Sequence, residues 1–214
     1  MFPFDVILFD VGGVLLTNGW DHRERAAATE RFHLDAGFEV RHLAHDDAWE
    51  RGAISMDAYL DAVIFNEPRN FSRDEFVDFV FAQSRLLRSG AMGILKHLAA
   101  SDEYVLGALN NEARETNEYR FSKFGLREYF SVALSSCYLG LRKPESAIYH
   151  RAIDILGGPV KRILFIDDRQ ENVEGAAAAG MKAIRFQSAD ALLREFVNLG
   201  VLQEPAMEVI CNLD

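Results

Sequence analysis

The key to the architecture is the stretch Ile163-Leu-Phe-Ile-Asp-Asp168, in which two acids directly follow four apolar residues. An unalternated apolar run of this length is typical of a strand that is buried on both faces of a sheet. The N-terminal stretch Val6-Ile-Leu-Phe-Asp10 repeats the pattern with one acid. Similar runs at residues 104–109, 131–134 and 181–186 also end at polar residues. The sequence therefore predicts five strands.

Stretches with helical character separate these strands. They lie at residues 91–98, 112–124, 144–156, 172–179 and 189–199. Strands that alternate with helices imply right-handed crossovers and a parallel sheet. We therefore expect an α/β fold, a Rossmann-like parallel sheet with helices on both faces. Ligands bind such sheets at the carboxyl ends of the strands, so the polar residues there are the candidate site.

The segment 17–88 interrupts this alternation, because it contains no strand-like apolar run. It does contain helix starts. Ser55 precedes one apolar stretch, and Ser72-Arg-Asp-Glu75 has the pattern of a capping box. We expect a small α-helical unit at 17–88, inserted into a core formed by 1–16 and 89–214.

The composition excludes several classes of protein. The 214 residues carry 23 Lys and Arg against 33 Asp and Glu, a net charge of −10, which argues against nucleic-acid binding. No apolar run reaches the roughly 18 residues of a membrane span, and the start MFPFDVILFD lacks the basic residues of a signal peptide. Two cysteines without a CxxC motif, Cys137 and Cys211, fit a reducing compartment. We expect a cytoplasmic monomer or homodimer that binds neither nucleic acid nor a membrane.

Three carboxylates follow two of the predicted strands: Asp10 after the first, and Asp167 and Asp168 after the fourth. A single Asp after a strand is commonly a turn or capping residue. If the two strands are neighbours, however, the three acids converge and repel one another strongly. Mg²⁺, which binds carboxylates, carbonyls and water, would relieve that repulsion. The sequence therefore predicts a magnesium site.

Polar and glycine residues after the other strands complete the candidate site. Gly12 and Gly13 allow a sharp turn and a close approach to a ligand, and the Gly12 carbonyl could face the cation; a plain turn is the alternative. The amides of Asn110 and Asn111 could bind phosphate or cap the next helix. Lys143 lies at a helix start, which normally prefers anions, so it either reaches an anionic group or is simply exposed.

Together these motifs resemble the haloacid dehalogenase superfamily of aspartate-nucleophile hydrolases, including the helical cap of its first subfamily. The four matching motifs, in order, are Phe9-Asp-Val-Gly-Gly-Val14, Leu109-Asn-Asn111, Arg142-Lys-Pro-Glu145 and Ile163-Leu-Phe-Ile-Asp-Asp168 with Asn172. Within the superfamily they look closest to the branch with the amino-terminal phosphatase domain of soluble epoxide hydrolases and bacterial sugar-phosphate phosphatases.

The resemblance implies a role for each of these residues. Asp10 would be the nucleophile that forms an aspartyl-phosphate, and Lys143 would neutralise it and the phosphate. Mg²⁺ would be held by Asp10, the Gly12 carbonyl and Asp168, with Asp167 bound directly or through water. The residues implied in substrate binding are Asn110, Asn111 and Gly13. The expected substrate is a small phosphorylated metabolite.

Two positions depart from the family pattern. Phosphatases of the superfamily usually carry a second Asp two residues after the nucleophile, an acid–base group worth roughly 10²–10⁴ in rate, where this chain has Gly12. Asn110 stands where Ser or Thr is usual. Three alternatives remain: a phosphatase with altered proton handling, a carbon-attacking hydrolase like the dehalogenases, or a non-catalytic binding protein. We favour the first, because the dehalogenases do not need the metal that Asp167 and Asp168 suit.

A phosphatase of this kind would need a good leaving group, such as an anomeric sugar phosphate or an acyl phosphate, or an acid lent by the cap. The cap candidates, each more typical of a surface position, are Asp21, His22, His33, His42 and His45. Trp20, Trp49 and Tyr59 could line a pocket, but we expect most of them to belong to the core.

Overall fold

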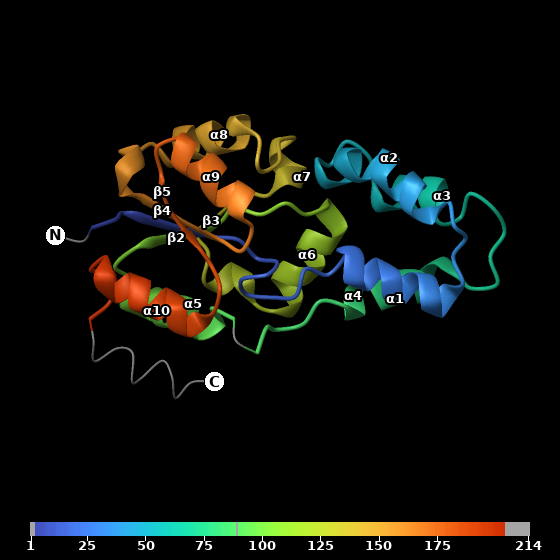
Figure 1. Ribbon diagram of the computed structural model, residues 1–214, viewed down its shortest axis with the longest axis horizontal. Coiled ribbons are helices and arrows are strands. Elements are labelled where there is room, and N and C mark those ends of the chain that lie inside the picture. Colours follow the sequence, from blue (N-terminus) through green and yellow to red (C-terminus); the bar gives the residue numbers. More distant parts are fainter. Residues whose placement is uncertain (1–2, 89, 204–214) are drawn as a thin grey trace.

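A computed structural model describes residues 3–88 and 90–203. Its centre is a five-stranded sheet with the order β3-β2-β1-β4-β5, and every pairing is parallel. The strands are β1 (Val6–Phe9), β2 (Val105–Ala108), β3 (Val132–Ala133), β4 (Ile163–Asp167) and β5 (Lys182–Arg185). This confirms the predicted α/β fold (Figure 1).

Helices cover both faces of the sheet (Figure 1). The helices of this part are α5 (Met92–Ser101), α6 (Arg114–Lys123), α7 (Ser136–Leu139), α8 (Ser146–Leu156), α9 (Gln170–Ala178) and α10 (Ala189–Asn198), with short 3-10 helices at Leu126–Glu128 and Val160–Arg162. Successive side chains of a strand point to opposite faces. Ile7 and Phe9 of β1 accordingly pack in one hydrophobic core with α5 and α10, whereas Val6 and Leu8 pack in the other with α8 and α9.

The register of β1 against β4 sets the position of the acids. Phe9 pairs with Ile166, and the Asp10 N–H donates to the Ile166 carbonyl over 2.8 Å. The residues one step further along the two strands are Asp10 and Asp167. The chain adds β2 and β3 on one side of β1 and β4 and β5 on the other, so this point is a topological switch point, the usual ligand site of such sheets.

Four helices lie between β1 and α5: α1 (His22–Phe32), α2 (Phe38–Glu50), α3 (Met56–Val63) and α4 (Arg73–Ala82). We call them the cap helices; they have a hydrophobic core of their own, and Figure 1 shows them at one end of the molecule. Both predicted helix starts are confirmed, because Ser55 caps α3 and Ser72 forms a capping box with Glu75 at α4. The starts of α1 and α2 were not predicted.

Trp49 and Tyr59 belong to the core of the cap helices, as expected, and their rings stack with centroids 4.0 Å apart. Trp20 is only partly buried against that core. Within residues 3–88 and 90–203, no helix is both long and apolar enough to cross a membrane. Cys211 and the end of the predicted core unit, 204–214, lie outside the described residues, and the domain boundaries stay a prediction.

Candidate active site

The ends of β1 and β4 bring three carboxylates together. Asp10, Asp167 and Asp168 each place a carboxylate oxygen within 4.8 Å of the others. Asp167 is fully buried, and the Asp10 side chain is 12% exposed. The predicted convergence of the three acids is therefore confirmed. That they hold a metal ion stays a prediction at this point.

Lys143 provides the positive charge beside this cluster. Its side chain is 1% exposed, and its Nζ lies 3.0 Å from Asp10 Oδ1 and 2.6 Å from Asp167 Oδ2. Burial alone would lower the pKa of Lys143, but the carboxylates of Asp10 and Asp167 outweigh it and raise that pKa. The lysine is therefore a buried cation. The alternative of a solvent-exposed lysine is excluded.

The two adjacent acids of the fourth motif have different surroundings. Asp167 accepts hydrogen bonds from the backbone N–H of Arg169 at 2.8 Å and from the Asn172 amide at 3.0 Å, in addition to Lys143. Asp168 Oδ1, by contrast, is buried and accepts no hydrogen bond from the described residues. A buried carboxylate oxygen without a partner is costly, which makes Asp168 a candidate metal ligand.

The raised pKa values of two of the clustered acids also indicate a site for a cation. Burial raises the pKa of Asp10 to about 7; the charge of Lys143 lowers it and that of Asp167 raises it further. Burial and the neighbouring Asp167 also raise the pKa of Asp168. A hard divalent cation among these oxygens would stabilise the ionised forms of both acids. The donor set therefore fits Mg²⁺.

The two glycines after Asp10 serve different purposes. Gly13 has φ of +71°, and a Cβ there would lie 2.2 Å from Asp168 Oδ2, so only glycine leaves room for that carboxylate. A Cβ on Gly12 would meet the Asn18 side chain at 3.0 Å and the Arg120 guanidinium at 3.8 Å. The space beside position 12 is therefore bordered by these two side chains.

Both predicted phosphate-binding asparagines bond to other protein groups. Asn110 is buried; its amide donates to Asn117 at 3.0 Å, and its carbonyl oxygen accepts from Ser135 at 2.8 Å. Asn111 forms a two-way pair with the backbone of Lys143, at 2.8 and 2.9 Å. Neither caps α6, whose N-cap is Ala113. Asn111 thus holds the lysine-bearing segment in place, while phosphate binding by either residue stays a prediction.

A cavity of about 280 Å³ opens over Asp10 of the carboxylate cluster, and core and cap segments both line it. Its lining includes Asp10, Gly12 and Lys143 on the core side and Trp20 and His42 on the cap side. Charged side chains predominate in the rest of the lining, which includes Asp21, Arg25, Asp46, Glu50, Glu112, Arg142 and Arg169. The cavity therefore suits a small polar ligand.

One expectation for the cap is wrong: His42 is not a surface residue. It is 2% exposed, and its Nδ1 lies 2.9 Å from the Tyr59 hydroxyl, which also accepts from the Trp20 indole at 3.0 Å. Burial lowers the pKa of His42, so the ring is neutral at pH 7. His22 and His33 are exposed, as expected. The burial of His42 follows from a partner seventeen positions away, which local sequence does not reveal.

Two functional candidates were missed by the sequence reasoning, Arg120 and Glu50. Arg120, on α6, is 2% exposed and bonds the backbone carbonyls of Thr17 and Asn18 and the Glu112 carboxylate. It thereby holds the loop that follows β1 over the cavity. No local pattern marks Arg120, because its contacts with Thr17 and Asn18 join parts of the chain that are about a hundred residues apart.

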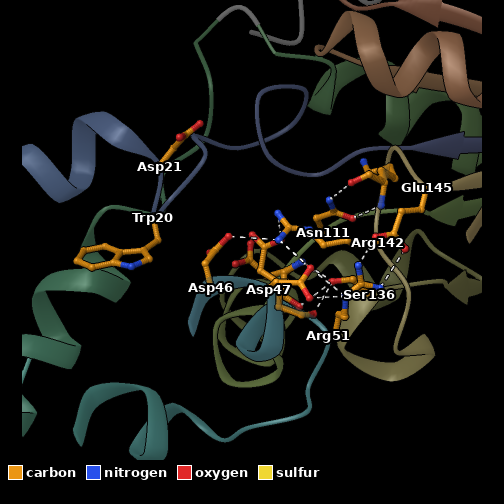
Figure 2. A network of polar contacts seen from close by, with 12 residues as sticks. Trp20, Asp21, Asp46, Asp47, Arg51, Asn111, Ser136, Arg142 and Glu145 are labelled. Carbon is orange, nitrogen blue, oxygen red and sulfur yellow. Dashed lines mark hydrogen bonds and ion pairs between the residues drawn. The ribbon is translucent and has the colours of Figure 1, made fainter. Parts of the chain in front are cut away.

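Ion pairs join α2 to the segment that carries Lys143 (Figure 2). Arg142 lies 3.3 Å from Asp46, 3.4 Å from Asp47 and 2.8 Å from Glu50. Arg51, just after α2, pairs with Glu145. Among the described residues, the acids that pair with Arg142 all come from the C-terminal end of α2, and the cap is fixed to the core beside the catalytic lysine candidate.

Comparisons with known proteins agree with this geometry. A family profile described as haloacid dehalogenase-like hydrolase matches residues 4–180. The flavin mononucleotide hydrolase 1 of Arabidopsis thaliana is 34% identical over 112 residues, 52% of this chain and 45% of that protein. The bifunctional epoxide hydrolase 2 of Sus scrofa is 23% identical over 224 residues, 94% of this chain and 40% of that protein. This chain therefore spans under half the length of both relatives.

A bacterial relative matches over most of its length. The phosphoglycolate phosphatase of Mesorhizobium japonicum is 25% identical over 202 residues, 89% of this chain and 87% of that protein. Among solved structures, a HAD family enzyme from Bacteroides thetaiotaomicron, determined as a magnesium complex, superimposes with a TM-score of 0.71. It is 20% identical and covers 90% of this chain and 99% of its own, so it shows a shared fold.

Proposed function

Because the chain belongs to the haloacid dehalogenase-like hydrolases, we propose that it is a Mg²⁺-dependent phosphatase of small phosphorylated metabolites. The observation that carries the proposal is the cluster of Asp10, Asp167 and Asp168 around the buried Lys143. A hydrolase that attacks phosphorus with an aspartate needs that nucleophile and positive charge around the phosphoryl group, which a lysine and a bound metal ion can supply. This cluster has residues for each of these needs.

Asp10 is the proposed nucleophile. Its contacts with the Val11 N–H and with Lys143 are both made by Oδ1, so we assign the attack on phosphorus to Oδ2. The ester oxygen leaves with the electron pair of the broken P–O bond, and an aspartyl-phosphate remains. Water then hydrolyses the aspartyl-phosphate and regenerates the Asp10 carboxylate.

Lys143 and the cation site have separate tasks. Lys143 lowers the pKa of Asp10 and so favours its ionised form, and it stabilises negative charge on the phosphoryl oxygens. We propose that Asp10, Asp168 and the Gly12 carbonyl hold Mg²⁺, with Asp167 a ligand directly or through water; Gly13 leaves room for the Asp168 carboxylate. The ion, when bound, would neutralise charge on the transferring phosphoryl group.

The cavity supports a small substrate. Its volume of about 280 Å³ lies just below the range for ligand pockets, roughly 300–1,000 Å³. Its charged lining favours a phosphorylated metabolite that carries further polar groups. The names of two of the relatives, a flavin mononucleotide hydrolase and a phosphoglycolate phosphatase, support phosphate esters as the substrate class.

The test is phosphate release from a panel of phosphomonoesters, with and without Mg²⁺. The panel should include sugar phosphates, phosphoglycolate, p-nitrophenyl phosphate and acetyl phosphate. We expect turnover of at least one ester that EDTA abolishes. If no ester or acyl phosphate is turned over in a metal-dependent manner, the proposal is wrong. Metal-independent halide release from 2-haloacids would instead favour the carbon-attacking alternative.

A further inference from the structure

The missing acid at position 12 leaves the leaving group without an obvious proton donor, so the other acids of the cavity are the candidates. Two of them are engaged elsewhere. Asp21 caps α1 and pairs with Arg169 at 2.7 Å. Glu112 pairs with the buried Arg120 and accepts from the Thr116 hydroxyl at 2.9 Å. Both carboxylates thus already have partners among the described residues.

The remaining candidates on the cap, Asp46, His42 and Glu50, differ in their contacts. Asp46 pairs with Arg142 at 3.3 Å and lies 3.7 Å from His42. His42 is neutral at pH 7, and its Nδ1 already faces Tyr59. Glu50 differs from these groups and from Glu171, an exposed acid of the cavity lining, because its Oε2 is fully buried and makes no hydrogen bond with the described residues. The Arg142 guanidinium lies 2.8 Å from that atom but outside hydrogen-bond geometry.

The position of Glu50 is fixed by backbone contacts between cap and core. Glu50 is the last residue of α2, and its carbonyl accepts from the Ser136 hydroxyl at 2.7 Å. The same hydroxyl accepts from the Glu112 N–H at 2.9 Å, just past the end of β2. Two residues later, a Cβ on Gly52 would lie 2.4 Å from the Cys137 carbonyl oxygen. This end of α2 is therefore docked against the core at the strand ends where Asp10 lies.

The side chain of Glu50 lines the same cavity as Asp10 and Gly12 and is 23% exposed. Four charged side chains from different parts of the fold act on the Glu50 carboxyl group: those of Asp46, Glu112, Arg142 and Arg169. Burial is the main reason why the pKa of Glu50 is raised to about 8; Asp46 and Glu112 raise it as well, whereas Arg142 and Arg169 lower it. A carboxyl group in these surroundings is largely protonated at neutral pH. It can therefore donate a proton there.

We propose that Glu50 supplies the acid–base group that Gly12 lacks, as the proton donor to the leaving group. This inference rests on the proposed function. It goes beyond the family's usual arrangement, because the acid would come from the end of a cap helix and would be in place only while α2 is docked at Ser136.

The chemistry balances in two steps. As Asp10 bonds to phosphorus, the P–O bond to the leaving group breaks, and the proton of the Glu50 carboxyl goes to the departing oxygen. Glu50 is then a carboxylate. In the second step it takes a proton from the water that attacks phosphorus, the bond to Asp10 breaks, and inorganic phosphate leaves. Glu50 ends protonated, as it began.

The experiment compares Glu50→Gln with wild type on two aryl esters, in the full chain with Mg²⁺. p-Nitrophenyl phosphate has a good leaving group that needs no proton, whereas phenyl phosphate has a poor one. We expect kcat/KM to fall about 10²–10⁴-fold on phenyl phosphate and under about tenfold on p-nitrophenyl phosphate. Since the second step also needs Glu50, the variant should release p-nitrophenol in a burst approaching one per active site.

The matched control is Asp47→Asn, which removes an acid from the same helix that also pairs with Arg142 but does not line the cavity. It should keep the wild-type ratio between the two esters. Glu50→Asp, which retains a shorter carboxyl group, should keep part of the activity on phenyl phosphate. The wild-type rate should fall on the alkaline side with an apparent pKa near the 8 of Glu50, and this limb should be absent in Glu50→Gln.

Equal losses on both esters, no burst and an unchanged alkaline limb would overturn the proposal while leaving the phosphatase intact. If Glu50→Gln does not fold, Glu50→Asp decides: a selective loss on phenyl phosphate supports the proton donor, and an equal loss on both esters overturns it. A wild-type chain that turns over no ester at all would overturn the proposed function itself, and this proposal with it.

Discussion

Lys143 Nζ lies 2.6 Å from Asp167 Oδ2, and both side chains are almost completely removed from solvent. The same Nζ contacts Asp10 at 3.0 Å, so a single buried cation serves two carboxylates. Removing one partner of a buried ion pair leaves the other charge uncompensated, which costs far more than the pair contributes. The cluster is therefore sensitive to the loss of its lysine in stability as well as in activity.

Lys143→Met should lower the free energy of unfolding by about 3–5 kcal/mol in EDTA, measured by urea denaturation. Mg²⁺ should recover part of this loss, because a bound cation would replace the missing charge. Lys161→Met, at an exposed position, should change stability by under about 0.5 kcal/mol. A loss that Mg²⁺ leaves unchanged would speak against a cation site at these acids.

Asp10→Asn should reduce turnover to background, because an amide oxygen cannot replace the carboxylate as a nucleophile. The turnover is measured as phosphate release from the ester of the panel that wild type hydrolyses fastest. Asp5→Asn is the control: Asp5 is an exposed acid just before the same strand, and its carboxylate pairs with Arg162. It should retain wild-type turnover. Persistent activity of Asp10→Asn would remove Asp10 as the nucleophile.

Gly13→Ala should weaken Mg²⁺ activation, because the new Cβ would displace the Asp168 carboxylate. The backbone cost of a side chain at this positive φ is about 1–3 kcal/mol. Gly157→Ala separates the two effects, since Gly157 has φ of +69° and nothing lies within 4 Å of its Cβ position. Gly157→Ala should lose about as much stability as Gly13→Ala, and its turnover should keep the wild-type dependence on Mg²⁺. Mg²⁺ titrations of turnover that coincide for the two variants would contradict the prediction.

Gly12→Asp tests whether the usual acid can be restored. The new side chain must displace the end of the Asn18 side chain, which can rotate, and would face Arg120. If Glu50 is the proton donor, the substitution should change kcat/KM on phenyl phosphate by under about threefold in wild type and raise it at least about tenfold in Glu50→Gln. A large gain in the wild-type background would mean that Glu50 does not fill the role.

The pH dependence of stability should also reveal Glu50. Because its pKa is raised from 4.5 to about 8 in the folded state, its contribution to stability is fully present below pH 4.5. It is lost as the pH rises through about 8. Relative to Glu50→Gln, wild type should therefore lose stability across this range, at most by about 1.4 kcal/mol per unit of pKa shift.

Urea denaturation in EDTA at several pH values provides the comparison. Asp47→Asn should show the opposite sign, because hydrogen bonds from Arg51 hold the pKa of Asp47 below its usual value. Relative to that variant, wild type gains stability as the pH rises through the acidic range. Parallel curves for wild type and Glu50→Gln would be inconsistent with a raised pKa at Glu50.

Much of the sheet follows from the sequence, because a strand covered on both faces requires a continuous apolar run. Four of the predicted runs form strands of four or five residues. The run at 131–134 yields only Val132–Ala133, and Ala133 is exposed there. The convergence of Asp10 with Asp167 and Asp168 follows equally directly, from the common direction of neighbouring parallel strands.

The cap side of the site was less predictable. Asp21 and Glu24 form a capping box that marks the start of α1, a local signal that could have been used. The role of Glu50, by contrast, depends on Ser136 and Arg142, which are more than eighty residues away in the chain. Burial of a polar side chain by distant partners leaves no periodic trace in the sequence.

The contact between Gly52 and the Cys137 carbonyl has a consequence for protein engineering. A side chain of any size at position 52 would collide with the core backbone, so main-chain shape fixes this docking in addition to the ion pairs. The ion pairs of Arg51 and Arg142 around it weaken with salt, whereas steric fit does not. A chimera that carries the cap of another hydrolase would therefore need to retain residues 50–52, or the new cap would be seated in a different register over the nucleophile.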